Sequence, residues 1–85
     1  MQPETSLEAY AAIKPSLRPL QEQVLNTIKR FPCGVTDEQL FNITGIAPNT
    51  CRPRRIELVA LGLVMDTGDR QRTTSGRQAI LWKAV

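Results

Sequence analysis

The spacing of apolar side chains changes once along the chain. Between positions 19 and 61 they recur every three or four residues, which predicts helices, and after position 62 they fall in two short runs, which predicts strands. The first helical pattern covers residues 19–30 and ends at Pro32 and Gly34, which break regular structure. Its predicted apolar face consists of Leu20, Val24, Leu25, Ile28 and Phe31.

The second helical pattern has the clearest local signature. Thr36 and Gln39 have the spacing of a capping box, in which each side chain bonds the other residue's backbone N–H. Val35 and Leu40 have the spacing of a hydrophobic staple across the same helix start. Gly45 suits the left-handed residue that ends many helices, so a short helix is predicted between Thr36 and Gly45.

The third helical pattern begins between Pro48 and Thr50 and ends at Leu61, before Gly62. Pro53 favours the later start, because a proline in the first turn loses no helical hydrogen bond. A start at Pro48 would put Pro53 inside the helix, where it would kink the chain.

The two apolar runs cover residues 63–65 and 79–82, with a polar, arginine-containing stretch between them. They predict two antiparallel strands joined by a long basic loop, with Ser75 and Gly76 at its tip. Trp82 in the second run and Cys51 in the preceding helix are predicted to be core residues rather than a base-stacking and a redox residue.

A further short helix is predicted over residues 5–14, ended by Pro15. We assign residues 1–16 to an N-terminal extension and residues 17–85 to the main domain. A helix this short is marginal alone, so it packs on the main domain, pairs across a homodimer, or frays. The apolar residues available for a dimer contact are Leu7, Tyr10 and Ala11.

Composition narrows the classes of function. The 85 residues contain no histidine, which excludes a His-based catalytic triad or metal site, and we predict a protein that is not an enzyme and needs no cofactor or metal. The two cysteines, Cys33 and Cys51, form no disulfide framework, and no apolar run is long enough to span a bilayer. A cytoplasmic protein is therefore expected.

The charge is uneven along the chain. Residues 1–48 carry five acidic and four basic side chains, whereas residues 49–85 carry three acidic and seven basic ones. Six of those seven are arginines, whose forked guanidinium suits contacts with phosphate and guanine.

The order helix, short helix, tight turn, helix and hairpin resembles a winged helix-turn-helix domain of the small phage and prophage type. The residues that carry the resemblance are 36–40, Gly45-Ile46, 49–51, 57–58, 61–64, the basic hairpin stretch 68–77, and 79–82. It covers about residues 17–85. Cys51 stands where valine or isoleucine is more usual in the family, and Pro53 is also less usual there.

The resemblance implies an α+β fold, with a three-helix helix-turn-helix core, a C-terminal β-hairpin wing and a short extra N-terminal helix. It implies a phage-type transcriptional regulator that binds double-stranded DNA in a bacterial or phage-infected cell. Helix 49–61 would enter the major groove, where the first helical turn reaches base edges, and wing 67–78 would lie on the backbone or minor groove. The candidate DNA-binding residues are Asn49, Thr50, Arg52, Arg54, Arg55, Arg70, Arg72, Thr74, Ser75 and Arg77.

A helical wheel separates the three helix arginines. Arg55 lies nearest the core stripe, so its stem is expected to pack and its head either to reach solvent or to pair with an acid such as Glu57 or Glu22, while a base contact stays open for it. Arg52 and Arg54 are the better candidates for reading bases. The alternative function is a winged-helix module, such as a small phage inhibitor, that acts on a protein partner, because the net charge of +3 is modest.

Overall fold

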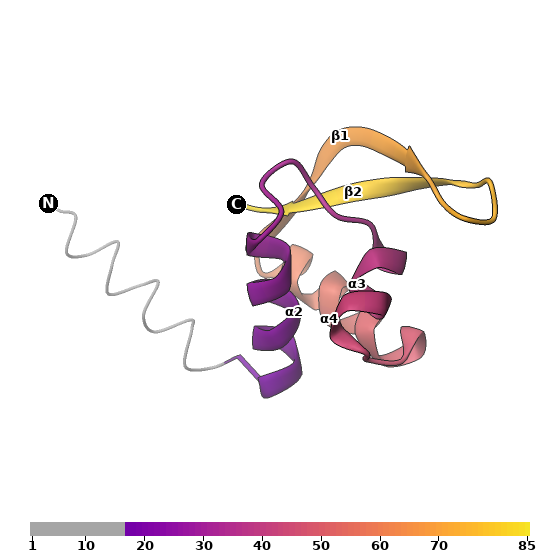
Figure 1. Ribbon diagram of the computed structural model, residues 1–85. Coiled ribbons are helices and arrows are strands. Elements are labelled where there is room, and N and C mark those ends of the chain that lie inside the picture. Colours follow the sequence, from indigo (N-terminus) through magenta and orange to yellow (C-terminus); the bar gives the residue numbers. More distant parts are fainter. Residues whose placement is uncertain (1–16) are drawn as a thin grey trace, which may run out of the picture.

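Residues 17–85 form three helices followed by an antiparallel hairpin (Figure 1). The computed structural model describes residues 17–85, so the predicted helix 5–14 and its dimer contacts lie outside the described residues. The elements are α2 (Pro19–Lys29), α3 (Asp37–Thr44), α4 (Pro48–Ala60), β1 (Val64–Arg72) and β2 (Gln78–Ala84). The predicted α+β class and the order of these five elements are confirmed. None of the described helices is long and apolar enough to cross a membrane.

Helix α2 supplies much of the core, but the prediction that Leu20 belongs to its buried face is wrong. Val24, Leu25 and Ile28 are buried, whereas Leu20 is 36% exposed because it lies in the first helical turn, beyond the core. Thr27 is buried instead, and its hydroxyl donates to the Gln23 carbonyl at 2.9 Å, so its burial leaves no hydroxyl donor unpaired.

Helix α3 has both of its predicted ends. The Gln39 N–H donates to the Thr36 hydroxyl at 3.1 Å, and the Thr36 N–H donates to the Gln39 side chain at 2.9 Å. Val35 and Leu40, the predicted staple, are fully buried. Gly45 ends the helix at φ 73°, a left-handed conformation that glycine adopts without strain.

The later start predicted for α4 is wrong. The helix begins at Pro48, and the Ala47 carbonyl accepts hydrogen bonds from the N–H groups of Thr50 and Cys51 at 2.9 and 2.8 Å. Pro53 therefore lies inside the helix and offers no N–H to the Asn49 carbonyl. Asn49 is exposed, so water can satisfy that carbonyl, which makes an interior proline tolerable at this position.

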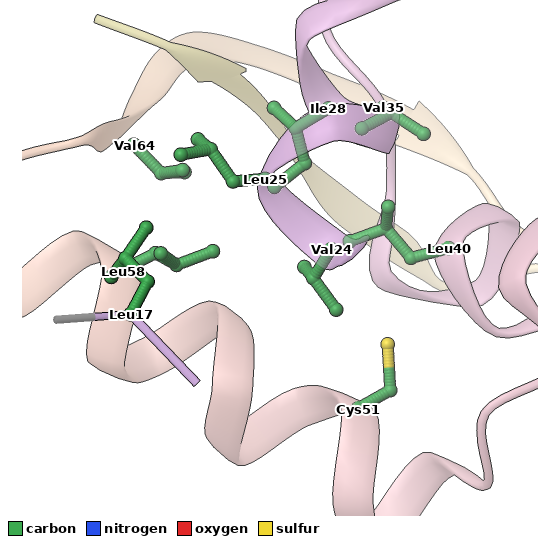
Figure 2. Packing of buried hydrophobic residues seen from close by; sticks show 9 residues of the cluster. All are labelled: Leu17, Val24, Leu25, Ile28, Val35, Leu40, Cys51, Leu58 and Val64. Atoms are coloured by element: carbon green, nitrogen blue, oxygen red, sulfur yellow. The ribbon is translucent and has the colours of Figure 1, made fainter. Parts of the chain in front are cut away.

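The core lies between the three helices and the base of the hairpin (Figure 2). Cys51 and Leu58 point into it from α4 and are fully buried, so the prediction of a core Cys51 is confirmed. Burial raises the pKa of the Cys51 thiol, which therefore stays neutral near pH 7. The other members are Leu17, Val24, Leu25, Ile28, Val35, Leu40 and Val64.

The hairpin strands are much longer than predicted. The polar stretch expected to be a loop is paired strand, with Arg70 opposite Ile80 and Arg72 opposite Gln78. Only residues 73–77 form the connection, closed by a 2.7 Å hydrogen bond from the Thr73 N–H to the Arg77 carbonyl. The prediction that Ser75 and Gly76 form the tip is confirmed. Backbone pairing needs no apolar side chains, which explains why hydrophobic pattern alone underestimated these strands.

A bulge interrupts β1. Asp66 pairs with Trp82 and Arg70 with Ile80, so residues 67–69 lie opposite a single residue of β2. The Asp66 carboxylate accepts from the Gly68 N–H at 2.7 Å, and the Thr67 hydroxyl accepts from the Asp69 N–H at 3.1 Å. These side chains replace the lost ladder bonds, and a bulge of this kind bends its strand.

The segment before α3 is fixed to β2. Val35 and Trp82 exchange two backbone hydrogen bonds of 2.8 Å and so form an isolated antiparallel β-bridge at the edge of β2. Gly34 has φ 111°, and a Cβ there would lie 2.8 Å from the Leu81 Cβ, so this close approach requires glycine. The N-terminal end of α3 is therefore held beside the hairpin.

Candidate functional site

A hollow of about 430 Å³ lies between the N-terminal end of α3, the first half of α4 and the outer part of the hairpin. It combines carboxylates, arginines, hydroxyls and two aromatic rings, which is a polar lining suited to a charged partner. The lining residues are Asp37, Glu38, Phe41, Arg52, Arg55, Thr73, Ser75, Arg77, Gln78, Ala79, Ile80 and Trp82.

Arg55 is the most firmly held cation in this hollow. Its Nε and Nη2 donate to the two carboxylate oxygens of Asp37 at 2.9 and 2.7 Å, and its guanidinium lies 4.1 Å from the ring centroid of Trp82. Its side chain is 11% exposed. The predicted packed stem is confirmed, and of the two alternatives for the head the ion pair is the one found, but its partner is Asp37 rather than Glu57 or Glu22. The fold brings the first turn of α3 to α4, so Asp37 is the nearest acid.

Trp82 joins the core to the hollow. It is half-buried and packs against the core cluster, while its outer face carries Arg55. Its predicted core position is confirmed, and in addition it orients an arginine, because a guanidinium stacks favourably on an indole ring.

Arg52 is held far more loosely. Its Nε lies 3.5 Å from Asp37 Oδ2, its guanidinium lies 5.3 Å from the Phe41 ring centroid, and its side chain is 55% exposed. The head therefore lies at the mouth of the hollow and remains open to a partner. Exposed Asn49 and half-buried Thr50 precede it in the first turn of α4, outside the lining.

Arg54 belongs to a different cluster. Its Nη2 donates to Glu57 Oε2 at 2.9 Å, and its Nε lies 2.9 Å from Oε1 without pointing at it. The Gln21 amide donates to Glu57 Oε1 at 2.8 Å, which links α2 to α4. The Gln21 hydrogen bond, with the help of Arg54, lowers the pKa of Glu57 from its ordinary value of 4.5. Arg54 therefore pairs, within α4, with the carboxylate that links α4 to α2, and it lies outside the hollow.

The hairpin arginines also divide into paired and unpaired side chains. Arg70 pairs with Asp66 at 3.1 Å beside the bulge, and the Gly68 N–H and Arg70 together lower the pKa of that carboxylate. Arg72 and Arg77 are exposed and make no ion pair within residues 17–85. Only Arg77 of these three lines the hollow.

The tip of the hairpin touches α3. The Thr74 hydroxyl donates to Glu38 Oε2 at 2.8 Å, and the Thr74 N–H donates to Oε1 at 3.5 Å. Beside it, the hydroxyls of Thr73 and Ser75 lie 3.0 Å apart and share a hydrogen bond. The tip therefore presents several donors toward the acidic first turn of α3.

The structure thus brings together only part of the predicted set. Arg52, Arg55, Ser75 and Arg77 line one hollow, and Thr74 closes it against Glu38. The other five predicted residues lie outside the lining: Asn49, Thr50, Arg54, Arg70 and Arg72.

Sequence reasoning missed the acidic wall of the hollow, Asp37 and Glu38. The only signal was their position in the first turn of a capped helix, where acidic residues favour the helix dipole. Their contacts span 18 and 36 positions of the chain, which local patterns do not report.

Within residues 17–85 no group of three or more His, Cys, Asp or Glu side chains could hold a metal ion. The chain matches no protein-family model and no curated protein. Its function therefore has to be argued from the hollow and its surroundings.

Proposed function

We propose that the domain is a winged helix-turn-helix module that binds double-stranded DNA as a phage-type transcriptional regulator. The observation that carries the proposal is that Arg52 of α4 and Arg77 of the hairpin line the same hollow, and both side chains are open to solvent. A helix start and a hairpin that each bring an exposed arginine to one concave surface suit the edge of a duplex, where major groove and phosphate backbone adjoin.

The contacts described above support a division of labour among the candidate residues. Asn49, Thr50 and Arg52, at the exposed start of α4, would meet base edges in the major groove. Arg72 and Arg77, which have no carboxylate partner in the described chain, would meet phosphates. Arg54 and Arg55 would act indirectly, because their guanidinium groups are already held by Glu57 and Asp37.

The experiment is a titration of the protein into fluorescent random-sequence duplex DNA at increasing salt. Affinity should fall steeply as salt rises, because each neutralised phosphate releases counterions. Arg52→Ala and Arg77→Ala should each weaken binding about 5- to 100-fold at low salt. Arg30→Ala is the matched control, since this exposed arginine lies outside the hollow.

Two results would reject the proposal. One is no binding to duplex at about 50 mM salt, where phosphate contacts are strong. The other is binding by both hollow variants that equals that of Arg30→Ala. If binding is confirmed, selection of duplexes from the same pool identifies the sequence that α4 recognises.

A protein-binding module is the second candidate function. Two observations favour it. Each arginine of α4 already has a carboxylate partner, which reduces the positive charge available to DNA, and Ile56 on the same helix is 50% exposed, which offers apolar surface to a protein. Size-exclusion chromatography with and without duplex separates the two functions. A stoichiometric complex with a protein and no shift with DNA would favour this second candidate.

A further inference from the structure

The Glu38 carboxylate occupies a pair of donors on the hairpin tip. Both of its oxygens accept from one residue, Thr74, through the hydroxyl at 2.8 Å and the backbone N–H at 3.5 Å. Arg77 follows Thr74 by three positions in the turn of the hairpin and lines the same hollow as Glu38. Two donors and an arginine that has no ion pair within residues 17–85 also suit a phosphate group, since a phosphate binds through oxygens that only accept.

The two acidic residues of α3 are held very differently. Asp37 is fixed by a two-point ion pair with Arg55, and its side chain is 18% exposed. Glu38 has no arginine partner, and its contacts with Thr74 are exposed to solvent. Exposed contacts of this kind are weak, so Glu38 can leave its position at small cost, whereas Asp37 cannot.

We propose that Glu38 stands in for a DNA phosphate in the free protein and is displaced when the duplex binds. This inference rests on the proposed function, and it assigns a specific occupant to the edge of the hollow at the hairpin tip, namely one phosphate of the backbone bound by Thr74 and Arg77. The Glu38 carboxylate then competes with that phosphate for the same donors and repels it, so Glu38 lowers affinity for any polyanion that lacks enough contacts to displace it.

The first test compares duplex binding by two variants. Glu38→Gln removes the negative charge and should raise affinity about two- to fivefold at low salt, with a smaller gain at high salt. Thr74→Val removes the hydroxyl donor and should lower affinity by a similar factor. Glu22→Gln on α2 is the matched control, because it removes the same charge away from the hollow.

The signs of these two effects distinguish competition from positioning. If Glu38 only holds the hairpin tip in place, Glu38→Gln and Thr74→Val both weaken binding, and the inference is overturned. The inference is equally overturned if Glu38→Gln behaves like Glu22→Gln. Thermal unfolding of each variant verifies that the fold is retained.

A second test does not involve DNA, so it separates this inference from the proposed function. Inorganic phosphate is titrated into the isotopically labelled protein while the Thr74 amide resonance is followed. The Thr74 amide should shift at lower phosphate concentration in Glu38→Gln than in the parent protein. An unresponsive Thr74 amide in Glu38→Gln would overturn the inference even if duplex binding is confirmed. Normal phosphate binding without any duplex binding would instead reject the proposed function.

Discussion

At the scale of single residues, Arg55 shows how a basic side chain can serve structure rather than recognition. Its guanidinium is shared between the Asp37 carboxylate and the Trp82 ring, so it joins α3, α4 and β2 at one point. Arg52, only three positions earlier, shares the same carboxylate at 3.5 Å yet remains mostly exposed. Sequence alone presents both simply as arginines at the start of one helix.

Arg55→Ala is therefore expected to destabilise the domain. The loss of two short charged hydrogen bonds and the stacking on Trp82 should lower the free energy of unfolding by about 1–3 kcal/mol, measured by urea denaturation. Arg55→Lys keeps the charge but not the planar fork, so it should fall between the parent and the alanine variant. Equal stability of Arg55→Ala and the surface control Arg30→Ala would contradict this role.

At the scale of elements, α2 and α4 are connected by Glu57, which accepts from Gln21 and pairs with Arg54. These partners stabilise the ionised carboxylate and lower its pKa in the folded protein below 4.5. A carboxylate whose pKa is lowered by folding stabilises the fold above the pKa that it has when unfolded. That contribution is lost as the pH falls through the lower pKa of the folded state.

The expected consequence is a difference between the parent and Glu57→Gln that depends on pH. At pH 7 the parent should be the more stable, and the difference should shrink as the pH falls below about 4.5, the region in which the unfolded carboxylate takes up its proton. Thermal unfolding of both proteins over a pH series measures it. A difference that is constant from pH 7 to pH 3 would show that ionisation of Glu57 does not stabilise the fold.

The sequence predicted some ends of these elements correctly and others not. The ends of α3 were predicted correctly because Thr36, Gln39 and Gly45 signal them within ten positions. The start of α4 was not, because Pro53 favours a start after Pro48. In the structure the Ala47 carbonyl accepts from the N–H groups of Thr50 and Cys51, so the helix begins at Pro48 and contains Pro53. The extent of the hairpin was missed because its outer pairs are joined by backbone bonds between polar residues.

At the scale of the whole molecule, two features that could not be predicted decide the character of the candidate site. The bulge at residues 67–69 bends β1, and the Val35–Trp82 bridge holds α3 beside β2. The hairpin then runs past α3, with its tip at the right of Figure 1, and the Thr74 hydroxyl at the tip donates to Glu38 in the first turn of α3. Both depend on tertiary contacts, which is why the sequence predicted the basic residues of the site but not its acidic wall.

The positive charge of the protein is not equally available to a partner at every arginine. The arginines of α4 are partly or wholly neutralised by Asp37 and Glu57, so the least compensated positive charge of the hollow lies on Arg77. In the proposed complex, much of the affinity would then come from the hairpin, and α4 would contribute mainly through Asn49, Thr50 and Arg52.

The most direct measurement of the central claim is a nitrogen-15 NMR titration of the protein with a short DNA duplex. If the hollow between α4 and the hairpin is the binding surface, the largest shifts will fall on the amides of residues 49–52 and 72–78 and on the side chains of Arg52 and Arg77. The absence of shifts at about 50 mM salt would contradict the claim, since phosphate contacts are strong there. So would a set of shifts centred on the exposed apolar residues Leu20, Met65 and Val85, which lie outside the lining of the hollow.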